Sequence, residues 1–236
     1  MEVILQVCAT NLIVLGDSNA KGIIHQNSRL ILSPTNAINR IACSLDYTVT
    51  NLSFFGQTIA KAYKKGFIDK ILAKKQQNVR NLVVINLGSN DADYDWSIVG
   101  ANPKDQHYPR TSVQEFEEYY TKIIKSLQNN GCEVMICSLL PLVAEKYFDN
   151  VLTTYVDTQS MLEILEGDKN NLTMHQKIFD DIIYRIAKEN NLRLLDLRQI
   201  MLNNPGWRDL YCEDGIHLNE KGQEFIANEV LKVYKK

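Results

Sequence analysis

The sequence predicts an α/β domain whose central sheet is parallel and is covered by helices on both faces. Two observations predict this class. Short apolar runs alternate along the chain with longer segments of helical periodicity, and the runs are apolar throughout instead of every second residue. Strands of that kind are buried on both faces, as they are between two layers of helices. The 236 residues show no internal repeat, low-complexity tract or Pro- and Gly-rich linker, so we expect a single domain over residues 1–236.

Five short segments are the expected strands, and most of them are followed by a glycine, a proline or a polar loop. They cover residues 12–15, 48–54, 82–87, 134–140 and 192–197. In a parallel sheet, loops at the carboxyl ends of the strands gather at one edge and form a crevice. Polar residues that follow different strands are therefore expected to meet there.

The segments between these runs have helical signals. Ser33-Pro34 resembles an N-cap followed by proline at the first helical position, with an apolar face behind it at Ile38, Ile41 and Leu45. Residues 59–71 carry apolar side chains every fourth position, which predicts one long helix. Ser112 and Glu115 form a capping box before a helix that ends at Asn130-Gly131.

A long helical stretch, residues 147–190, is expected to break near Gly167. Its first part belongs to a helical insertion at about 142–175. Together with the loop 102–110, this insertion is expected to wall the crevice. A last helix is expected from residue 220 onward.

Composition narrows the classes of partner. The formal net charge is −2 and the lysine pairs are short, so no basic stripe predicts nucleic-acid binding. No apolar stretch approaches the roughly 20 residues that span a bilayer. The five cysteines lack C-x-x-C spacing, which suits reduced thiols; they are Cys8, Cys43, Cys132, Cys137 and Cys212. With no signal-like start, the expected location is the cytoplasm.

Two short motifs could carry chemistry. Ser18 follows the first expected strand in Gly16-Asp17-Ser18, where a sharp turn would expose its hydroxyl, which needs a positioned base to act as a nucleophile. Asp214 and His217 are three residues apart, so the carboxylate could orient the imidazole as that base. Taken alone, Ser18 could equally cap a helix, and Asp214 could form an Asx-turn beside a surface histidine.

Donors for an oxyanion are available at two further strand ends. Asn90, in Gly88-Ser-Asn90-Asp91, could donate from its side-chain amide, and the backbone N–H groups of Ser18 and Gly56 could complete the site. Asn90 and Gly56 could also be ordinary turn residues. His25 and His175 have no such partner and are interpreted as surface residues.

Together these residues resemble the SGNH (GDSL-type) serine hydrolase superfamily of esterases and lipases. The match covers the Gly-Asp-Ser block at 16–18, Gly56, the Gly-x-Asn-Asp block at 88–91 and the Asp-x-x-His block at 214–217, in the family's order. The resemblance implies a three-layer α/β/α sandwich with a five-stranded parallel sheet, a flavodoxin-like fold, and no cofactor or metal. The sequence around residues 90–96 and 141–148 looks like a bacterial subgroup of unassigned substrate.

The expected function is hydrolysis of carboxylic esters, with short acyl or acetyl groups, on a carbohydrate or another small molecule, through an acyl-enzyme. An acyltransferase, a thioesterase or a non-catalytic binding module would share the scaffold. Substrate contacts are expected from Asp17, Asp91, Trp96, His107 and Tyr147.

Two rival sites have weaker support from the sequence. A calcium loop at Asp91, Asp93 and Asp95 lacks the required glycine and glutamate. Cys212 could act as a nucleophile, but it precedes the turn that carries the base. The sequence does not predict an oligomeric state.

Overall fold

The central sheet has five parallel strands in the order β4-β1-β5-β6-β7. The computed structural model describes residues 9–26 and 29–234, and Cys8 lies outside these ranges. The strands are β1 (Thr10–Gly16), β4 (Thr48–Asn51), β5 (Arg80–Asn86), β6 (Glu133–Cys137) and β7 (Arg193–Leu195). Ile13 of β1 pairs with Thr50 on one side and with Val83 on the other. The predicted parallel sheet is confirmed.

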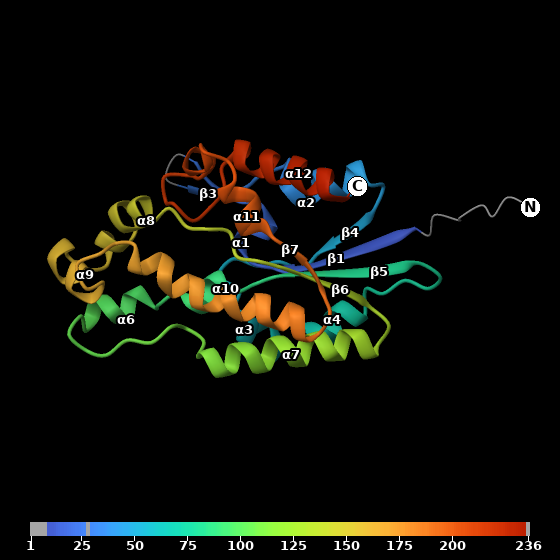
Figure 1. Ribbon diagram of the computed structural model, residues 1–236, viewed down its shortest axis with the longest axis horizontal. Helices are drawn as coiled ribbons and strands as arrows, with labels where there is room; N and C mark the ends of the chain where they lie inside the picture. The colour runs from blue at the N-terminus through green and yellow to red at the C-terminus, as the bar shows by residue number, and fades with distance from the viewer. Residues whose placement is uncertain (1–8, 27–28, 235–236) are drawn as a thin grey trace, which may run out of the picture.

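Helices cover both faces of this sheet (Figure 1). One face packs against α2 (Ala37–Ser44), α11 (Leu197–Leu202) and α12 (Glu220–Tyr234), and the other against α3 (Ile59–Lys64), α4 (Phe67–Leu72), α7 (Val113–Asn129) and α10 (Asn171–Glu189). Because successive side chains of a strand point to opposite faces, Ile13 and Leu15 join the second group while Leu12 and Val14 join the first. The architecture is the three-layer α/β/α sandwich.

Three expected strands are shorter than predicted, and one of them is β7, which covers Arg193–Leu195 instead of 192–197. The pairing of β4 ends at Asn51 and that of β6 at Cys137, whereas the apolar runs continue to residues 54 and 140. After β6 the run continues because the loop itself is buried: Leu139 and Leu140 lie inside the protein without belonging to the sheet. Burial of this kind cannot be distinguished from strand pairing by an apolar pattern alone.

Two helix predictions were wrong in detail. The helix α2 begins after Asn36, whose side chain accepts the Asn39 N–H, and not at Ser33-Pro34. The segment 59–71 forms two helices, because Gly66 adopts a left-handed conformation (φ 64°) and ends the first of them. The cap at Ser112 is confirmed, since its hydroxyl accepts the Glu115 N–H at 3.2 Å.

The expected polar loop after the first strand contains an antiparallel hairpin that the prediction missed. It pairs β2 (Ile23–Gln26) with β3 (Arg29–Leu32). Leu30, Ile31 and Leu32 are exposed, so β3 has no core face whose pattern would have marked it as a strand.

Short helices gather at the left end of the molecule in Figure 1, beyond the sheet. They are α6 (Trp96–Ala101), α8 (Ala144–Asn150), the 3₁₀ turn η1 (Leu152–Thr154) and α9 (Thr158–Ile164). Their apolar side chains form a cluster of their own around Trp96, Phe148 and Met161. Segment 142–175, expected to be helical, supplies most of this cluster; its status as an insertion stays a prediction.

Within the described part of the chain, no helix combines the length and the apolar character needed to cross a membrane.

Candidate active site

Ser18 is the first residue of α1 (Ser18–Lys21), directly after β1. The turn between them is tight: a Cβ on Gly16 would lie 2.4 Å from the Cβ of Ala20, so the chain can turn here only at a glycine. Asp17 caps the helix, because its carboxylate accepts the Asn19 N–H at 2.9 Å. Burial raises the pKa of Asp17 to about 6. Ser18 is held rigidly at the carboxyl edge of the sheet.

His217 connects Ser18 to Asp214. Its Nε2 lies 2.9 Å from the Ser18 Oγ, and its Nδ1 lies 2.7 Å from an Asp214 carboxylate oxygen. All three side chains are buried. Since a carboxylate only accepts, Nδ1 carries the proton in this pair and Nε2 is left to accept the serine O–H. Residues from the amino-terminal and carboxyl-terminal parts of the chain, Ser18 and His217, therefore meet at this site.

Asp214 is fixed as an anion. Burial opposes its ionisation, but bonds from the His217 side chain and from the N–H groups of Ile216 and His217 outweigh burial and hold its pKa below the usual value. A carboxylate that is charged at neutral pH selects the tautomer at Nδ1 and would stabilise an imidazolium.

Asn19 joins the two halves of the site and was missed by the sequence analysis. Its side-chain amide donates to the Ile216 carbonyl at 2.9 Å, and its oxygen accepts the Leu218 N–H at 3.1 Å. The loop that carries His217 is thereby tied to α1. The available signal was an amide residue directly after the serine.

Asn90 lies on the short helix α5 (Ser89–Ala92), after β5. Gly88 enters this helix with φ 140°, and a Cβ there would lie 2.9 Å from a Leu139 methyl group. Asn90 lines the same cleft as Ser18 and His217, and no described residue forms a hydrogen bond with its side chain. Its amide is therefore available to a ligand in the cleft.

Gly56 lies in the loop after β4 and has φ 63°, a conformation that favours glycine. The preceding Phe55 stacks on the His217 imidazole, with 6.0 Å between the ring centres and 17° between the planes. This stacking brings the loop beside the catalytic histidine candidate, although Gly56 itself is not among the residues that line the cleft.

The expected substrate contacts divide into two groups. Tyr147 and Asp17 line the cleft. Asp91 and Trp96 do not line the cleft, so their role as substrate contacts stays a prediction that the cleft lining does not support. The Asp91 carboxylate accepts the Ile59 N–H at the start of α3 and the Thr111 hydroxyl, and Trp96 belongs to the apolar cluster.

His107 lines a neighbouring hollow and not the cleft itself. His175, interpreted from the sequence as a surface residue, lines both cavities and lies 2.8 Å from the Tyr94 hydroxyl through Nδ1. Nothing in the amphipathic pattern of α10 indicates which of its polar residues faces a cleft.

The rival sites do not match the observed contacts. Asp91, Asp93 and Asp95 bond to three different sets of partners: the α3 backbone, the Trp96 and Tyr147 side chains, and Ser97. They do not converge as calcium ligands would.

The second rival site, Cys212, has the properties of an inert thiol. Burial raises the pKa of this thiol, and its sulfur accepts the backbone N–H of His25.

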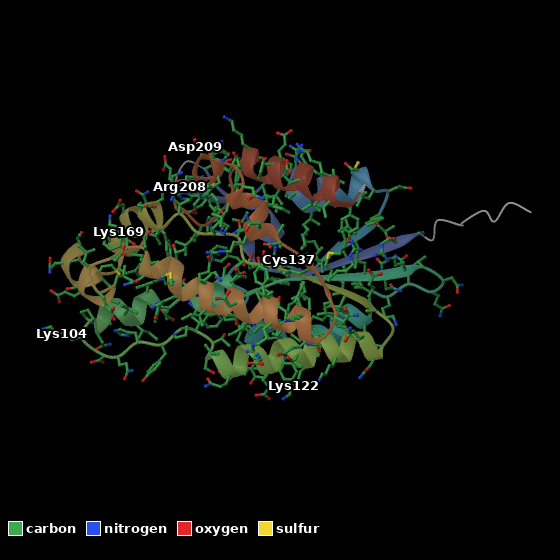
Figure 2. The ribbon with its side chains drawn as sticks, viewed as in Figure 1. Lys104, Lys122, Cys137, Lys169, Arg208 and Asp209 are labelled. Atoms are coloured by element: carbon green, nitrogen blue, oxygen red, sulfur yellow. The ribbon has the colours of Figure 1, made fainter. Side chains whose placement is uncertain are left out.

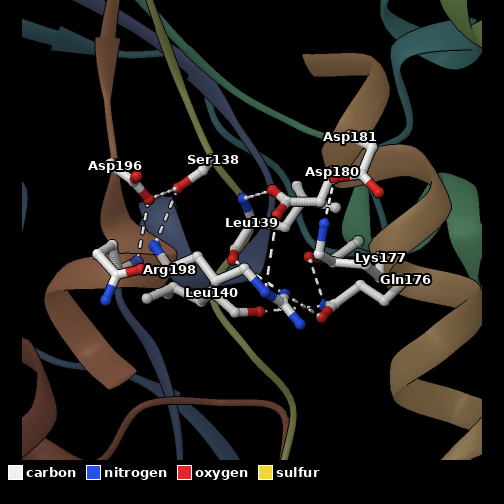
Figure 3. A network of polar contacts seen from close by, with 11 residues as sticks. Ser138, Leu139, Leu140, Gln176, Lys177, Asp180, Asp181, Asp196 and Arg198 are labelled. Atoms are coloured by element: carbon white, nitrogen blue, oxygen red, sulfur yellow. Dashed lines mark hydrogen bonds and ion pairs between the residues drawn. The ribbon is translucent and has the colours of Figure 1, made fainter. Parts of the chain in front are cut away.

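A buried polar network supports the wall of the cleft (Figure 3). The Arg198 guanidinium lies 3.1 Å from the Gln176 side-chain oxygen and 3.6 Å from Asp180. The Gln176 amide donates to the Leu140 carbonyl, and the Asp180 carboxylate accepts the Leu139 N–H. Because Gln176 and Leu140 line the cleft, the network fixes α10 against the end of β6.

The fold and these residues define a class of α/β/α hydrolase-like proteins, and solved structures share the fold. A catalytic mutant of the acetylxylan esterase Axe2 from Geobacillus stearothermophilus superposes with a TM-score of 0.64 at 13% identity, over 94% of this chain and 92% of that one. The esterase EstA from Pseudoalteromonas sp. superposes with a TM-score of 0.60 at 19% identity, over 96% of each chain.

The family model for GDSL-like lipase/acylhydrolase matches residues 12–230, and the chain belongs to this family. The predicted superfamily is confirmed. The GDSL esterase/lipase WDL1 of Oryza sativa subsp. japonica is 27% identical over 171 residues, which are 71% of this chain and 58% of the relative. The chain spans 58% or less of the length of the curated plant relatives that it matches. The bacterial subgroup stays a prediction.

Proposed function

We propose that the chain hydrolyses carboxylic esters with Ser18 as nucleophile, His217 as general base and Asp214 as the residue that orients the base. The observation that carries this proposal is the relay of two hydrogen bonds, 2.9 Å from Ser18 to His217 and 2.7 Å from His217 to Asp214. Such a relay raises the reactivity of a hydroxyl that is otherwise a weak nucleophile at neutral pH.

In the first half of the reaction, Nε2 takes the Ser18 proton as Oγ attacks the carbonyl carbon. The resulting oxyanion accepts hydrogen bonds from the N–H groups of Ser18 and Gly56 and from the Asn90 amide. The imidazolium then gives its proton to the leaving alcohol as the C–O bond breaks, and Ser18 keeps the acyl group. Water, deprotonated by His217, releases the acid and restores Ser18.

The proposed substrate carries a short acyl group on a hydroxylated alcohol such as a carbohydrate. The cleft, of about 680 Å³, has polar groups of Asn90, Tyr147 and Gln176 on its walls beside the nucleophile. A long aliphatic chain would remove such groups from water without replacing their hydrogen bonds. The proteins that share the fold include two acetylxylan esterases, AlAXEase and Axe2.

The test compares Ser18→Ala with the wild type on nitrophenyl esters from acetate to decanoate and on acetylated sugars. We expect the substitution to abolish turnover and labelling by a fluorophosphonate, with acetate esters preferred over decanoate in the wild type. Ser97→Ala, an exposed serine on α6, is the matched control. Undiminished hydrolysis by purified Ser18→Ala protein would refute the assignment. Transfer of the acyl group to an added sugar in place of water would identify an acyltransferase.

We also propose that the protein works in a reducing compartment such as the cytoplasm. The four cysteines in the described ranges are unpaired thiols, and three of them are buried: Cys132, Cys137 and Cys212. Burial raises the pKa of Cys137 to about 12, which keeps this thiol protonated.

A further inference from the structure

A second hollow adjoins the catalytic cleft. Its volume is about 930 Å³, and it lies between the loop that follows α6, with Lys104, Asp105 and His107, and the end of α9, with Glu163. Tyr94 and His175 line both cavities, so these two side chains form their common wall. The hollow therefore lies directly beside the cleft that contains Ser18, with Tyr94 and His175 at the boundary between them.

The common wall is ordered and polar. Tyr94 packs against Trp96 with 5.4 Å between the ring centres and against His175 with 5.5 Å, and its carbonyl accepts a hydrogen bond from Arg110. Burial lowers the pKa of His175, so at neutral pH its ring offers one donor and one acceptor nitrogen. Nδ1 bonds to Tyr94, and the structure shows no hydrogen bond between Nε2 and another described residue. One ring nitrogen therefore remains for a ligand.

The chemistry of the hollow favours a neutral, hydroxylated ligand. Lys104 donates, Asp105 and Glu163 accept, and His107 is anchored by a 2.8 Å bond from its ring to the Asn102 carbonyl. Hydroxyl groups both donate and accept, so they match this mixture, and the flat rings of Tyr94 and His175 can pack against sugar rings. An aliphatic chain would desolvate the charged groups, and an anionic chain would meet two carboxylates for one ammonium.

We propose that this hollow binds the part of the substrate that extends from the leaving alcohol, and that this part is an oligosaccharide or a similar hydroxylated chain. The inference rests on the proposed function, because it takes the ester to be held at Ser18. Its consequence is that the protein selects its substrate by the length of the alcohol, in addition to its preference for a short acyl group.

The first test measures kcat/KM for acetylated xylose and xylotetraose, and for acetylated glucose and cellotetraose. We expect at least one tetrasaccharide ester to react about 10-fold or more faster than its monosaccharide ester. In Lys104→Ala and His107→Ala, the ratio of tetra- to monosaccharide kcat/KM should fall about 2- to 10-fold for each lost hydrogen bond. Lys122→Ala is the matched control, because this lysine lies on α7, away from Lys104 (Figure 2).

A second measurement does not depend on turnover. Ser18→Ala protein should bind xylotetraose or cellotetraose, free of acyl groups, more tightly than the corresponding monosaccharide by calorimetry, and His107→Ala should remove this difference. Equal kcat/KM for short and long alcohols, or length ratios unchanged in the hollow variants, would overturn the inference. So would a preference for decanoate esters that the same variants abolish, since the hollow would then hold an acyl chain.

The two proposals fail differently. If Ser18→Ala retains ester hydrolysis, the proposed function is wrong. If Ser18→Ala is inactive and the wild type shows no dependence on alcohol length, the ester hydrolase stands and only the inference about the hollow is wrong.

Discussion

Asn90 contributes a single side-chain amide to the cleft, and its replacement is expected to affect catalysis and not folding. The side chain has no hydrogen-bond partner among the described residues, so its removal should not disturb the fold. Asn90→Ala should lower kcat about 10²–10³-fold and change KM little, because an oxyanion donor acts mainly in the transition state. Steady-state kinetics with nitrophenyl acetate would measure this, with Asn203→Ala on the exposed end of α11 as control. A change confined to KM would place Asn90 in ground-state binding.

The sequence analysis was most informative about individual residues of the candidate site. Ser18, Asp214 and His217 occur in short motifs whose spacing reflects local turns, and three predicted strand ends brought the motifs to one edge. His175 could not be predicted, because its role depends on which side of α10 meets the cleft, and that depends on packing between distant segments. Asp91 was predicted as a substrate contact because an acidic residue beside a motif looks the same whether it binds substrate or caps a buried helix.

Among the elements, α1 and the loop 214–218 form one unit through Asn19. Asn19→Ala removes two hydrogen bonds, which should lower the free energy of unfolding by about 1–3 kcal/mol. It should also lower kcat about 10–100-fold, since a small displacement of the base reduces the rate steeply. Urea unfolding and kinetics on the same samples would test both effects. Asn19→Asp, which keeps the acceptor for Leu218, should lose less; a variant as active as wild type would show that the loop holds its position without Asn19.

The contact between β6, α10 and α11 depends on a buried ion pair. Arg198→Met leaves the Asp180 carboxylate without its cation, so the free energy of unfolding should fall by about 3–5 kcal/mol. The loss should be smaller when Asp180→Asn is also present, because the uncompensated charge is then absent. Chemical denaturation of the four proteins of this cycle measures the coupling.

The exposed pair of Arg185 and Glu117 provides the comparison for Arg198. Arg185→Met should cost less than about 1 kcal/mol, since an ion pair in water contributes little. Similar losses for the two arginine variants would contradict the importance of burial.

The helix boundaries and the hairpin show which features of helices and strands an apolar pattern does not predict. The break at Gly66 separates α3 from α4, yet the apolar spacing continues across it because both helices bury the same side. A periodicity count therefore predicts one helix where the backbone makes two. The buried Asp180, in contrast, was detectable: it is a charged residue within the apolar stripe of α10, beside Phe179 and Ile183.

At the scale of the whole molecule, the active-site hydrogen bond joins residues 199 positions apart, so the site depends on the tertiary fold and not on any local segment. The sequence predicted the layers, because strand periodicity and helix periodicity are local properties. It predicted that segment 142–175 walls the cleft, and Tyr147 and His175 of this segment line it, but it did not indicate that α10 supplies His175 and Gln176.

Buried carboxyl groups make the stability of the fold depend on pH in a direction opposite to ordinary salt bridges. Burial raises the pKa of Asp91 to about 6, above the value of 3.8 expected when unfolded. Between these two values the folded protein holds a proton that the unfolded chain has released, so stability increases as pH falls from 7 to 5. His175 acts in the other direction, because burial lowers its pKa. The contribution of His175 is the same in wild type and in Asp91→Asn, so it cancels when the free energies of unfolding of the two proteins are subtracted.

We therefore expect the free energy of unfolding of wild type, relative to Asp91→Asn, to be about 1 kcal/mol greater at pH 5 than at pH 7. Urea denaturation of both proteins at pH 5, 6 and 7 measures this difference directly. The side-chain amide of the Asp91→Asn variant cannot titrate, whereas the wild-type carboxyl group takes up its proton within this interval. A difference that stays constant with pH, or that shrinks toward pH 5, would mean that the folded state keeps Asp91 ionised through its bonds to Ile59 and Thr111, and that burial is not the dominant influence on this group.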